Sequence, residues 1–339
     1  MNLSEQIKSM ILSGIVEEQH RKIGVEIESF YYEKGDLSRL ALENKNKYSA
    51  IDLLSDINKI AQANQDTHSY SLEPGGQLEW ASSPSISLWD ILNEYSKNVL
   101  AQKELCVNNA IDIGYFSVEP ISNPLDIVLI NSNKYQLMHN LFKNTGKLGP
   151  WMMRNTASIQ VNIDYTSEED ANEMAYVADA IQPLVSILFS NAPFIQGETV
   201  GTENLRWKIW NDTDSSRCGT LFEHGIRNPK NIINDYAKWL QSRECIFIEN
   251  PDGEFNAFDG DLGSMIATEN NPKLIYSAFR QIFTHVRFKT VLEVRGADRQ
   301  QKGKDIIPAA FLVGLLTSKK TRDTLLDEVT SWSEKDRDD

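Results

Sequence analysis

A nine-residue segment near the N-terminus, KIGVEIESF at positions 22–30, restricts the possible folds most strongly. Apolar residues at positions 23, 25 and 27 alternate with other residues, which is the pattern of a β-strand with two different faces. Glu26 and Glu28 therefore lie on the same face of this strand. On an exposed edge strand, water and salt would screen the two carboxylates at little cost. On an enclosed face they would require a cation, because an unpaired buried charge is very unfavourable.

The composition is typical of a globular protein and excludes several classes. The chain has 339 residues, 41% hydrophobic and 24% charged, and a formal net charge of -14. This charge argues against a general attraction to nucleic acid or to anionic membranes. No apolar run approaches the roughly 20 residues of a membrane span, and the N-terminus lacks the features of a signal peptide. We expect a cytoplasmic protein without nucleic-acid or membrane partners, which holds anionic ligands through local arginines or metal.

The chain contains no internal repeat and no long Pro, Gly or Ser linker, which favours a single domain over residues 1–339. Residues 317–339 are expected to form a charged C-terminal tail that is helical in part. Apolar residues at helical spacing predict helices near the N-terminus and over residues 36–64, 84–106, 135–142, 168–188, 231–241, 270–283 and 304–316. Further strands are predicted at residues 70–73 and 77–81, which Pro74-Gly75-Gly76 joins as a hairpin, and at 112–118, 158–164, 245–248 and 286–298.

Four extended segments carry acidic or amide side chains on one alternating face. These side chains belong to Glu26 and Glu28, Glu73 and Glu79, Gln160 and Asn162, and Glu293 with Arg295. Taken singly, each such face is more typical of a sheet surface in contact with water. Together with several apolar helices that need a sheet to cover, they favour one sheet whose uncovered face gathers the acids in an enclosed site. Oxygen ligands without histidine or cysteine suit Mg²⁺ and not zinc.

A second polar segment, LRWKIWNDTDSSRCG at positions 205–219, contains Arg206 and Arg217. In a chain with few basic residues, these two and Arg295 suggest clamps for carboxylate or phosphate, although pairing with surface acids is the alternative. Neither GxxxxGK(S/T) nor GxGxxG occurs, so neither a P-loop nor a Rossmann site is predicted. Gly75 and Gly76 either form only a tight turn or let a phosphate approach bare backbone.

Five motifs in order resemble the glutamate–cysteine ligases of the plant and proteobacterial type and related carboxylate–amine ligases. They are GVEIESF, SLEPGGQLEWASSP, GPWMMRNTASIQVNIDY, LRWKIWNDTDSSRCG and LEVRGADRQ, and the resemblance extends from about Ser13 to Leu316. It implies an α+β, glutamine-synthetase-like catalytic domain with an antiparallel sheet forming a funnel-shaped active site and helices packed on its outer face. It also implies that ATP phosphorylates the γ-carboxylate of glutamate and that the α-amine of cysteine then displaces phosphate, the first step of glutathione synthesis.

The resemblance further implies which acids bind metal. Two or three Mg²⁺ would be held by Glu26, Glu28, Glu79 and Glu293, with Glu28 also counted as catalytic. Glu73 would contact substrate and is a further candidate for metal binding. Such ions would neutralise a triphosphate and align it with the carboxylate to be phosphorylated, because phosphoryl transfer between two anions depends mainly on cations.

Nucleotide and substrate contacts follow from the same resemblance. Gln160 and Asn162 would orient metal or the phosphates of ATP, and Arg217 would contact the nucleotide. Arg295 would balance charge on the phosphoryl group in transfer. The remaining substrate-binding residues are Arg206, which would clamp the glutamate α-carboxylate, Trp210 as pocket wall, and Arg154.

The chain departs from the plant pattern at three points. The plant arginine that precedes TVQVNLD lies one residue nearer the glutamine than Arg154 does, and a one-residue shift on a strand reverses its face. The plant chains also continue well beyond the segment that matches residues 314–316. Finally, Cys106, Cys218 and Cys245 do not match the plant redox cysteines and form no CxxC, so we predict reduced thiols and no disulfide switch.

Two alternatives to a glutamate–cysteine ligase stay open. One is a γ-glutamyl ligase that uses another amine in a secondary pathway, because the sequence does not reveal the acceptor pocket. The other is a family member that has lost catalysis. Glutamate and cysteine, or another amine, are the expected small-molecule partners, and both a monomer and a homodimer are compatible with the sequence.

Overall fold

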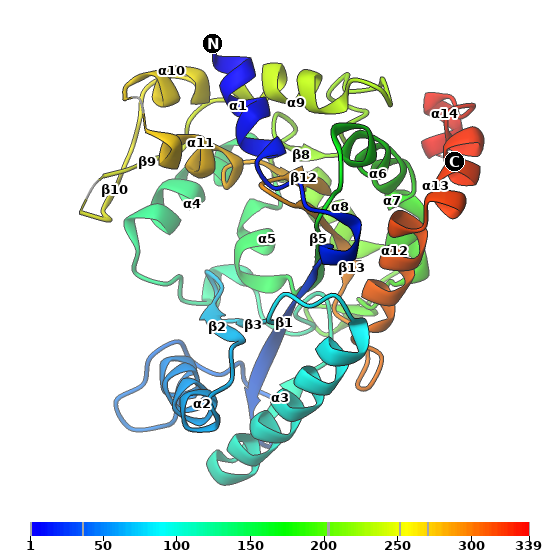
Figure 1. Ribbon diagram of the computed structural model, residues 1–339. Coiled ribbons are helices and arrows are strands. Elements are labelled where there is room, and N and C mark those ends of the chain that lie inside the picture. Colours follow the sequence, from blue (N-terminus) through cyan, green and yellow to red (C-terminus); the bar gives the residue numbers. More distant parts are fainter. Residues whose placement is uncertain (1, 36, 202–203, 251, 270, 339) are drawn as a thin grey trace.

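The computed structural model describes residues 2–35, 37–201, 204–250, 252–269 and 271–338. At its centre is a seven-stranded sheet in which all strand pairs are antiparallel (Figure 1). The strand order is β12-β13-β5-β1-β3-β2, and β4 pairs with the distal half of β1. The strands are β1 (Ile23–Glu33), β2 (Ser69–Leu72), β3 (Leu78–Ala81), β4 (Ile111–Gly114), β5 (Ser158–Ile163), β12 (Val286–Phe288) and β13 (Leu292–Asp298).

The register of this sheet brings the acidic and amide residues onto one face. Residues directly opposed on antiparallel strands point to the same side. The opposed pairs are Glu28 with Glu79, Glu26 with Gln160, and Glu293 with Asn162. The polar face predicted from four separate segments is therefore continuous across β3, β1, β5 and β13.

The opposite face of the sheet is apolar and forms the main core. Val25 and Ile27 of β1, Val161 of β5 and Val294 of β13 are all almost fully buried there. Helices α6 (Glu168–Ala180) and α12 (Ile307–Thr317) cover this face, as Figure 1 shows. The predicted α+β fold, with an antiparallel sheet and helices on its outer face, is confirmed.

The other elements surround this core. The helices are α1 (Leu3–Leu12), α2 (Ala50–Asn64), α3 (Leu88–Asn109), α4 (Asn133–Thr145), α5 (Gly149–Asn155), α7 (Gln182–Leu188), α8 (Leu205–Asn211), α9 (Ile232–Gln241), α10 (Leu262–Ala267), α11 (Pro272–Phe279), α13 (Lys319–Val329) and α14 (Glu334–Asp338). Short two-residue strands pair as β6 (Phe194–Ile195) with β7 (Glu198–Thr199), β8 (Cys218–Gly219) with β11 (Phe283–Thr284), and β9 (Ile248–Glu249) with β10 (Phe255–Asn256).

Three predicted helices are shorter than expected or divided. The helix expected over residues 36–64 begins only at Ala50, where Ser49 and Asp52 form a reciprocal capping box, and residues 37–49 are irregular. Asp36 lies outside the described residues. The helix expected over residues 168–188 divides at Ile181 into α6 and α7, with Pro183 in the first turn of α7. Of the helix expected over 270–283, only α11 forms, and Asn270 is outside the described residues.

Three further segments differ from the predictions. Residues 286–298 form a hairpin, β12 and β13, and not one strand. A helix that was not predicted, α5, precedes β5, so Arg154 lies on a helix and the argument about its strand face does not apply. Residues 245–247, expected as a strand, are irregular, and β9 begins at Ile248.

The charged C-terminal segment is helical, as predicted, and it packs against α6. The buried guanidinium of Arg322 pairs with Asp170 at 2.8 Å and with Glu173 at 3.1 Å. Arg337 lies 3.7 Å from Asp179. In the described part of the chain, every helix is too short or too polar to cross a membrane.

Candidate active site

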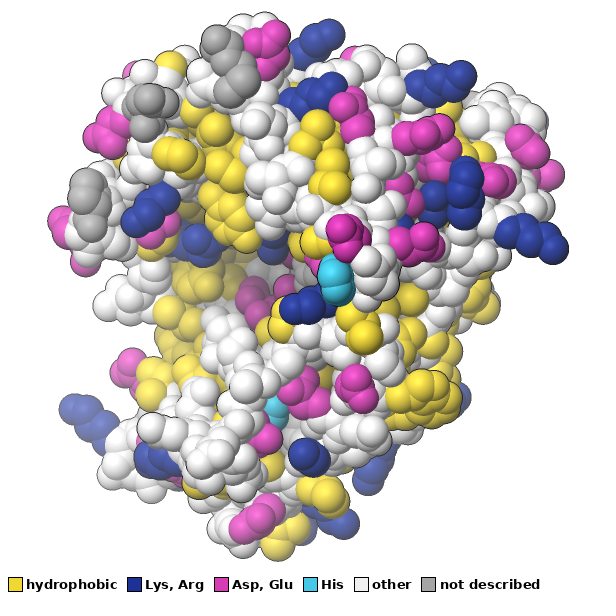
Figure 2. Space-filling view, in the orientation of Figure 1, with side chains coloured by type: hydrophobic (Ala, Val, Ile, Leu, Met, Phe, Trp, Pro, Cys, Tyr) yellow, Lys and Arg dark blue, Asp and Glu magenta, His cyan; other side chains and the backbone are white. Residues whose placement is uncertain are grey.

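A cavity of about 390 Å³ lies on the polar face of the sheet. Its floor consists of residues from β1, β3, β5 and β13, and its walls come from the β2–β3 hairpin and from α4, α5 and α8. Figure 2 shows the surface hollowed near the centre of the molecule, with acidic side chains visible inside the hollow. Eight residues of the predicted site line this cavity: Glu26, Glu28, Glu73, Glu79, Gln160, Trp210, Glu293 and Arg295.

One half of the cavity is acidic. Carboxylate oxygens of Glu28, Glu73 and Glu79 lie within 4.8 Å of one another. The β1–β3 register places Glu28 opposite Glu79. The turn after β2 directs Glu73 to the same side, and Gly76 closes this turn by donating its N–H to the Glu73 carbonyl at 2.8 Å. The acids therefore converge because three chain segments meet at one point of the sheet.

Burial and mutual repulsion raise the pKa values of these carboxyl groups. Burial, followed by the charge of Glu28, raises the pKa of Glu73 to about 7. Burial and the charges of Glu73 and Glu26 hold the pKa of Glu79 well above its usual range. The pKa of Glu28 is raised mainly by burial, against the opposing charges of Arg206 and Arg295. A cluster of oxygen donors with raised pKa values fits a hard divalent cation, which would replace the protons and remove the repulsion.

Two glycines shape the turn that carries Glu73. A Cβ atom added to Gly75 would lie only 2.6 Å from the backbone of Arg154, so α5 packs directly on this glycine. Gly76 has a φ of 80°, in the left-handed region that favours glycine. Close packing and turn geometry thus require glycine or favour it at both positions.

The other half of the cavity is basic and is organised around Glu293. Its carboxylate pairs with the Arg287 guanidinium, with Lys289 Nζ at 2.8 Å and with Arg295 Nη1 at 3.4 Å. Burial alone would raise the pKa of Glu293, but these three cations hold it well below its usual range. Glu293 is therefore already neutralised by side chains, unlike Glu28 or Glu79.

A chain of hydrogen bonds connects the basic half to the acidic half. Arg295 Nη1 donates to Gln160 Oε1 at 2.5 Å, and Gln160 Nε2 donates to Glu28 Oε1 at 3.0 Å. The backbone N–H of Ser158 donates to the other oxygen of Glu28 at 2.6 Å. These bonds fix the direction of the Glu28 carboxylate and the amide orientation of Gln160.

Four predicted site residues do not line the cavity among the residues described. Arg206 donates to the backbone carbonyls of Arg295 at 3.1 Å and Gly296 at 3.3 Å, where the pairing of β13 with β5 shifts register. Arg217 is fully buried and pairs with Asp214 at 2.8 Å. The other two are also engaged elsewhere: Arg154 donates to the Ile127 carbonyl and Asn162 donates to Glu26 Oε1. Their hydrogen-bonding groups are used to hold other elements in place.

Several cationic residues that line the cavity were missed by the sequence analysis. They are Lys134, Arg280, Arg287 and Lys289. The signal for Arg287 was present, because it stands opposite Glu293 across the β12–β13 hairpin. Interpreting residues 286–298 as one strand placed the two residues six positions apart on a single strand and concealed the pair.

An oxygen-ligand cluster facing several cations on an antiparallel sheet defines a site suited to Mg²⁺-dependent chemistry on phosphates. The sequence model of the protein family glutamate-cysteine ligase family 2 (GCS2) matches residues 22–339 of this chain. The chain therefore belongs to this family of ATP-dependent carboxylate–amine ligases.

Similar proteins include plant enzymes named glutamate–cysteine ligase, chloroplastic. The chain is 28% identical over 356 residues to ligase A of Oryza sativa subsp. indica, covering 98% of this chain and 70% of that protein. It is 29% identical over 362 residues to the ligase of Arabidopsis thaliana, covering 98% of this chain and 66% of that protein. The chain thus spans about two thirds of the length of these relatives.

A solved structure has a similar fold. The glutamate–cysteine ligase of Francisella tularensis, crystallised in complex with AMP, superposes with a TM-score of 0.53 at 12% sequence identity. The match covers 94% of this chain and 72% of that chain. This similarity supports the fold alone.

Proposed function

We propose that this chain is an ATP-dependent ligase that joins the γ-carboxylate of L-glutamate to the α-amine of L-cysteine through a γ-glutamyl phosphate. Its membership of the family supports the reaction class. The observation that carries the proposal is the single cavity in which three carboxylates within 4.8 Å of one another face a cluster of cations. Two anions, a triphosphate and a carboxylate, can approach each other only where such charges neutralise both.

In this proposal, Glu28, Glu73 and Glu79 hold Mg²⁺. Glu26, which lies on β1 together with Glu28, is a further ligand. Bound there, Mg²⁺ would neutralise phosphate charge and act as a Lewis acid toward the phosphoryl group. Gln160 and the N–H of Ser158 hold Glu28 in the direction needed for this task. Asn162 supports Glu26 by donating to its Oε1 at 2.9 Å.

The basic half of the cavity would bind the phosphates. Arg287, Lys289 and Arg295 carry three positive charges against the single negative charge of Glu293. Two positive charges are therefore in excess at this wall, which suits the nucleotide phosphates and the phosphoryl group in transfer. We infer that Glu293 positions these cations and is not a direct metal ligand.

The glutamate substrate would lie between the two halves, with Trp210 as a wall. Arg206 is engaged by backbone carbonyls, so its role here is to position Arg295 rather than to clamp the substrate. Lys134 and Arg280 line the cavity and are the cations left for the substrate α-carboxylate. In the second step the acceptor amine attacks the acyl carbon and inorganic phosphate leaves.

The test supplies ATP, Mg²⁺, glutamate and a panel of amines, and measures phosphate release and product mass. Turnover with cysteine alone supports the proposal. Turnover with a different amine would instead identify a γ-glutamyl ligase of another pathway. The absence of phosphate release with every amine, in protein shown to be folded, would refute a catalytic function. Glu28→Gln should abolish the Mg²⁺-dependent rate, whereas the exposed Glu198→Gln serves as the matched control and should not change it.

A further inference from the structure

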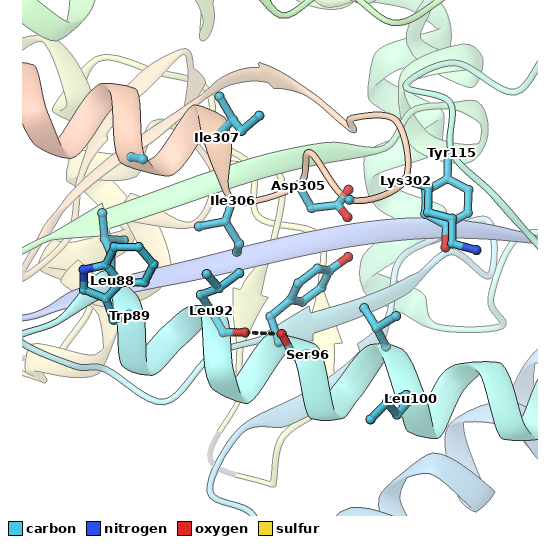
Figure 3. A pocket seen from close by; sticks show the side chains of 14 residues that line it. Leu88, Trp89, Leu92, Ser96, Leu100, Tyr115, Lys302, Asp305, Ile306 and Ile307 are labelled. Atoms are coloured by element: carbon cyan, nitrogen blue, oxygen red, sulfur yellow. Dashed lines mark hydrogen bonds between the residues drawn. The ribbon is translucent and has the colours of Figure 1, made fainter.

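A second cavity, separate from the proposed active site, lies beside α3. It has a volume of about 790 Å³ and runs between α3 and the segment that leads into α12 (Figure 3). Leu88, Trp89 and Leu92 of α3 line one side, and Ile306 and Ile307 line the other. Within the described part of the chain, this cavity and the proposed active site have no lining residue in common.

The apolar side chains of this groove are unusually exposed. Trp89 is 75% exposed and Ile307 is 51% exposed, although both are large and apolar. Leu100, further along the same helix, also lines the groove and is 67% exposed. Single exposed apolar residues are common, but a contiguous concave set of them is typical of a binding site.

One end of the groove is polar and positively charged. Tyr115 and Lys302 line the groove there, at the end away from Leu88 and Trp89 (Figure 3). An adjoining cavity of about 380 Å³ shares these two residues and adds Lys34 and Lys103. In the described residues these three lysines form no ion pair.

The carboxylates near this end of the groove are too few to cancel the positive charge of the lysines. Asp305 lines the groove, but the Arg299 guanidinium pairs with it and neutralises its charge. Asp112 is the other carboxylate and stands against the three lysines. In a chain with a formal net charge of -14, this end of the groove therefore has a local excess of positive charge.

We propose that this groove binds one molecule of a soluble amphiphilic carboxylate, with an acyl-like body and a carboxylate at one end. The body lies between α3 and Ile306–Ile307, and the carboxylate reaches Lys302 and the Tyr115 hydroxyl. The volume falls within the range of about 300–1,000 Å³ that small-molecule sites occupy. A concave groove of this size encloses a single chain, whereas a membrane surface would be met by protruding side chains. Charge complementarity at the basic end selects an anion over a cation.

The experiment is isothermal titration calorimetry with octanoate, decanoate and dodecanoate, each below its micelle concentration. We expect one molecule per chain. The affinity should rise about fourfold with each added CH₂ group, because each one buries more apolar surface. Decyltrimethylammonium should bind at least tenfold more weakly than decanoate. Tryptophan fluorescence should change on binding, and Trp89→Phe should remove most of that change.

Variants locate the site. Lys302→Gln should weaken carboxylate binding about threefold to fivefold and leave a neutral decyl maltoside unaffected. Leu92→Asp should abolish binding of both, and circular dichroism would show that it is folded. Lys97→Gln is the control, because Lys97 is exposed on the same helix and lines neither cavity.

Four results would overturn the proposal. They are equal affinity for decanoate and decyltrimethylammonium, no dependence on chain length, unchanged binding in the Lys302→Gln variant, and binding to anionic vesicles without binding to monomeric carboxylates. A dimer that Leu92→Asp dissociates in sedimentation, together with no carboxylate binding, would assign the groove to a second copy of the chain instead.

Discussion

Replacing Glu79 by glutamine should stabilise the metal-free protein while it removes a metal ligand. Glu79 lies in the acidic half of the cavity, opposite Glu28 and beside Glu73. Its carboxylate accepts one hydrogen bond, from Ser71 Oγ at 3.1 Å, and the amide oxygen of glutamine can accept the same bond. The substitution therefore keeps the shape and the hydrogen bond but removes the charge.

The magnitude follows from the charges involved. Two carboxylates about 5 Å apart repel each other by about 3 kcal/mol at an effective dielectric constant of about 20. Protonation limits this penalty, because the carboxyl group can take up a proton instead of staying charged. One pKa unit is about 1.4 kcal/mol. Protonating a group with an ordinary pKa of 4.5 at pH 8 therefore costs about 5 kcal/mol, which is the largest possible penalty. Glu79 is only half-buried and water screens part of the repulsion, so we expect a gain of about 1–3 kcal/mol, or about 1–4 °C in Tm for a chain of this length.

The pH dependence has a definite sign. Because the pKa of Glu79 is raised in the folded protein, the folded state holds a proton that the unfolded state releases. The penalty is absent below the ordinary pKa and grows as the pH rises toward the folded value. The stabilisation by Glu79→Gln should thus be present at pH 8 and disappear near pH 4.5.

The assay is differential scanning calorimetry of both proteins at pH 8 and pH 4.5, with EDTA or with Mg²⁺. Magnesium should raise the Tm of the wild type at pH 8, since ligand binding stabilises the folded state, and it should raise the Tm of Glu79→Gln much less. A variant that is less stable than wild type at both pH values would show that Glu79 is not repelled by its neighbours. A variant that keeps the full magnesium response would show that Glu79 is not a metal ligand.

Two other substitutions and one labelling experiment test separate parts of the structure. Glu293→Gln removes the carboxylate shared by three cations. It should lower the free energy of unfolding, measured by urea denaturation, by about 3–5 kcal/mol. A loss below about 1 kcal/mol would contradict the proposed positioning role. Arg217→Met should lower stability while leaving the Kd for nucleotide, measured by calorimetry, within about twofold of wild type. A tenfold weaker nucleotide affinity in folded protein would instead show that Arg217 contacts the nucleotide, as the sequence analysis expected. The three cysteines are buried and their thiol pKa values are raised to about 11–12 by burial, so iodoacetamide at pH 7.5 should label native protein far more slowly than urea-unfolded protein, as mass spectrometry would detect.

The features predicted best from the sequence are those that local patterns specify. Alternation over residues 22–30 correctly placed Glu26 and Glu28 on one face of β1, with Val25 and Ile27 on the other. The Pro-Gly-Gly turn correctly predicted the β2–β3 hairpin. Both features depend on residues within a few positions of one another, where backbone geometry alone decides the direction of each side chain.

Local patterns failed where long-range pairing decided the structure. No glycine or proline marks the turn between β12 and β13, and the hairpin forms because β13 pairs with β5, about 130 residues earlier in the chain. The contact between Arg287 and Glu293 depends on that turn. Similarly, Trp89 and Leu100 face an uncovered groove only because no other described element packs on that side of α3.

The sequence alone determined that acids from distant segments would share one face of an antiparallel sheet, because side-chain direction follows from strand periodicity. Only the tertiary structure decided which arginines reach the cavity. Arg206 donates to nearby backbone carbonyls and Arg217 pairs with Asp214, whereas Arg295 is directed toward Gln160 and Glu293. The direction of a long charged side chain depends on partners that folding brings within a few ångströms, and no local pattern contains that information.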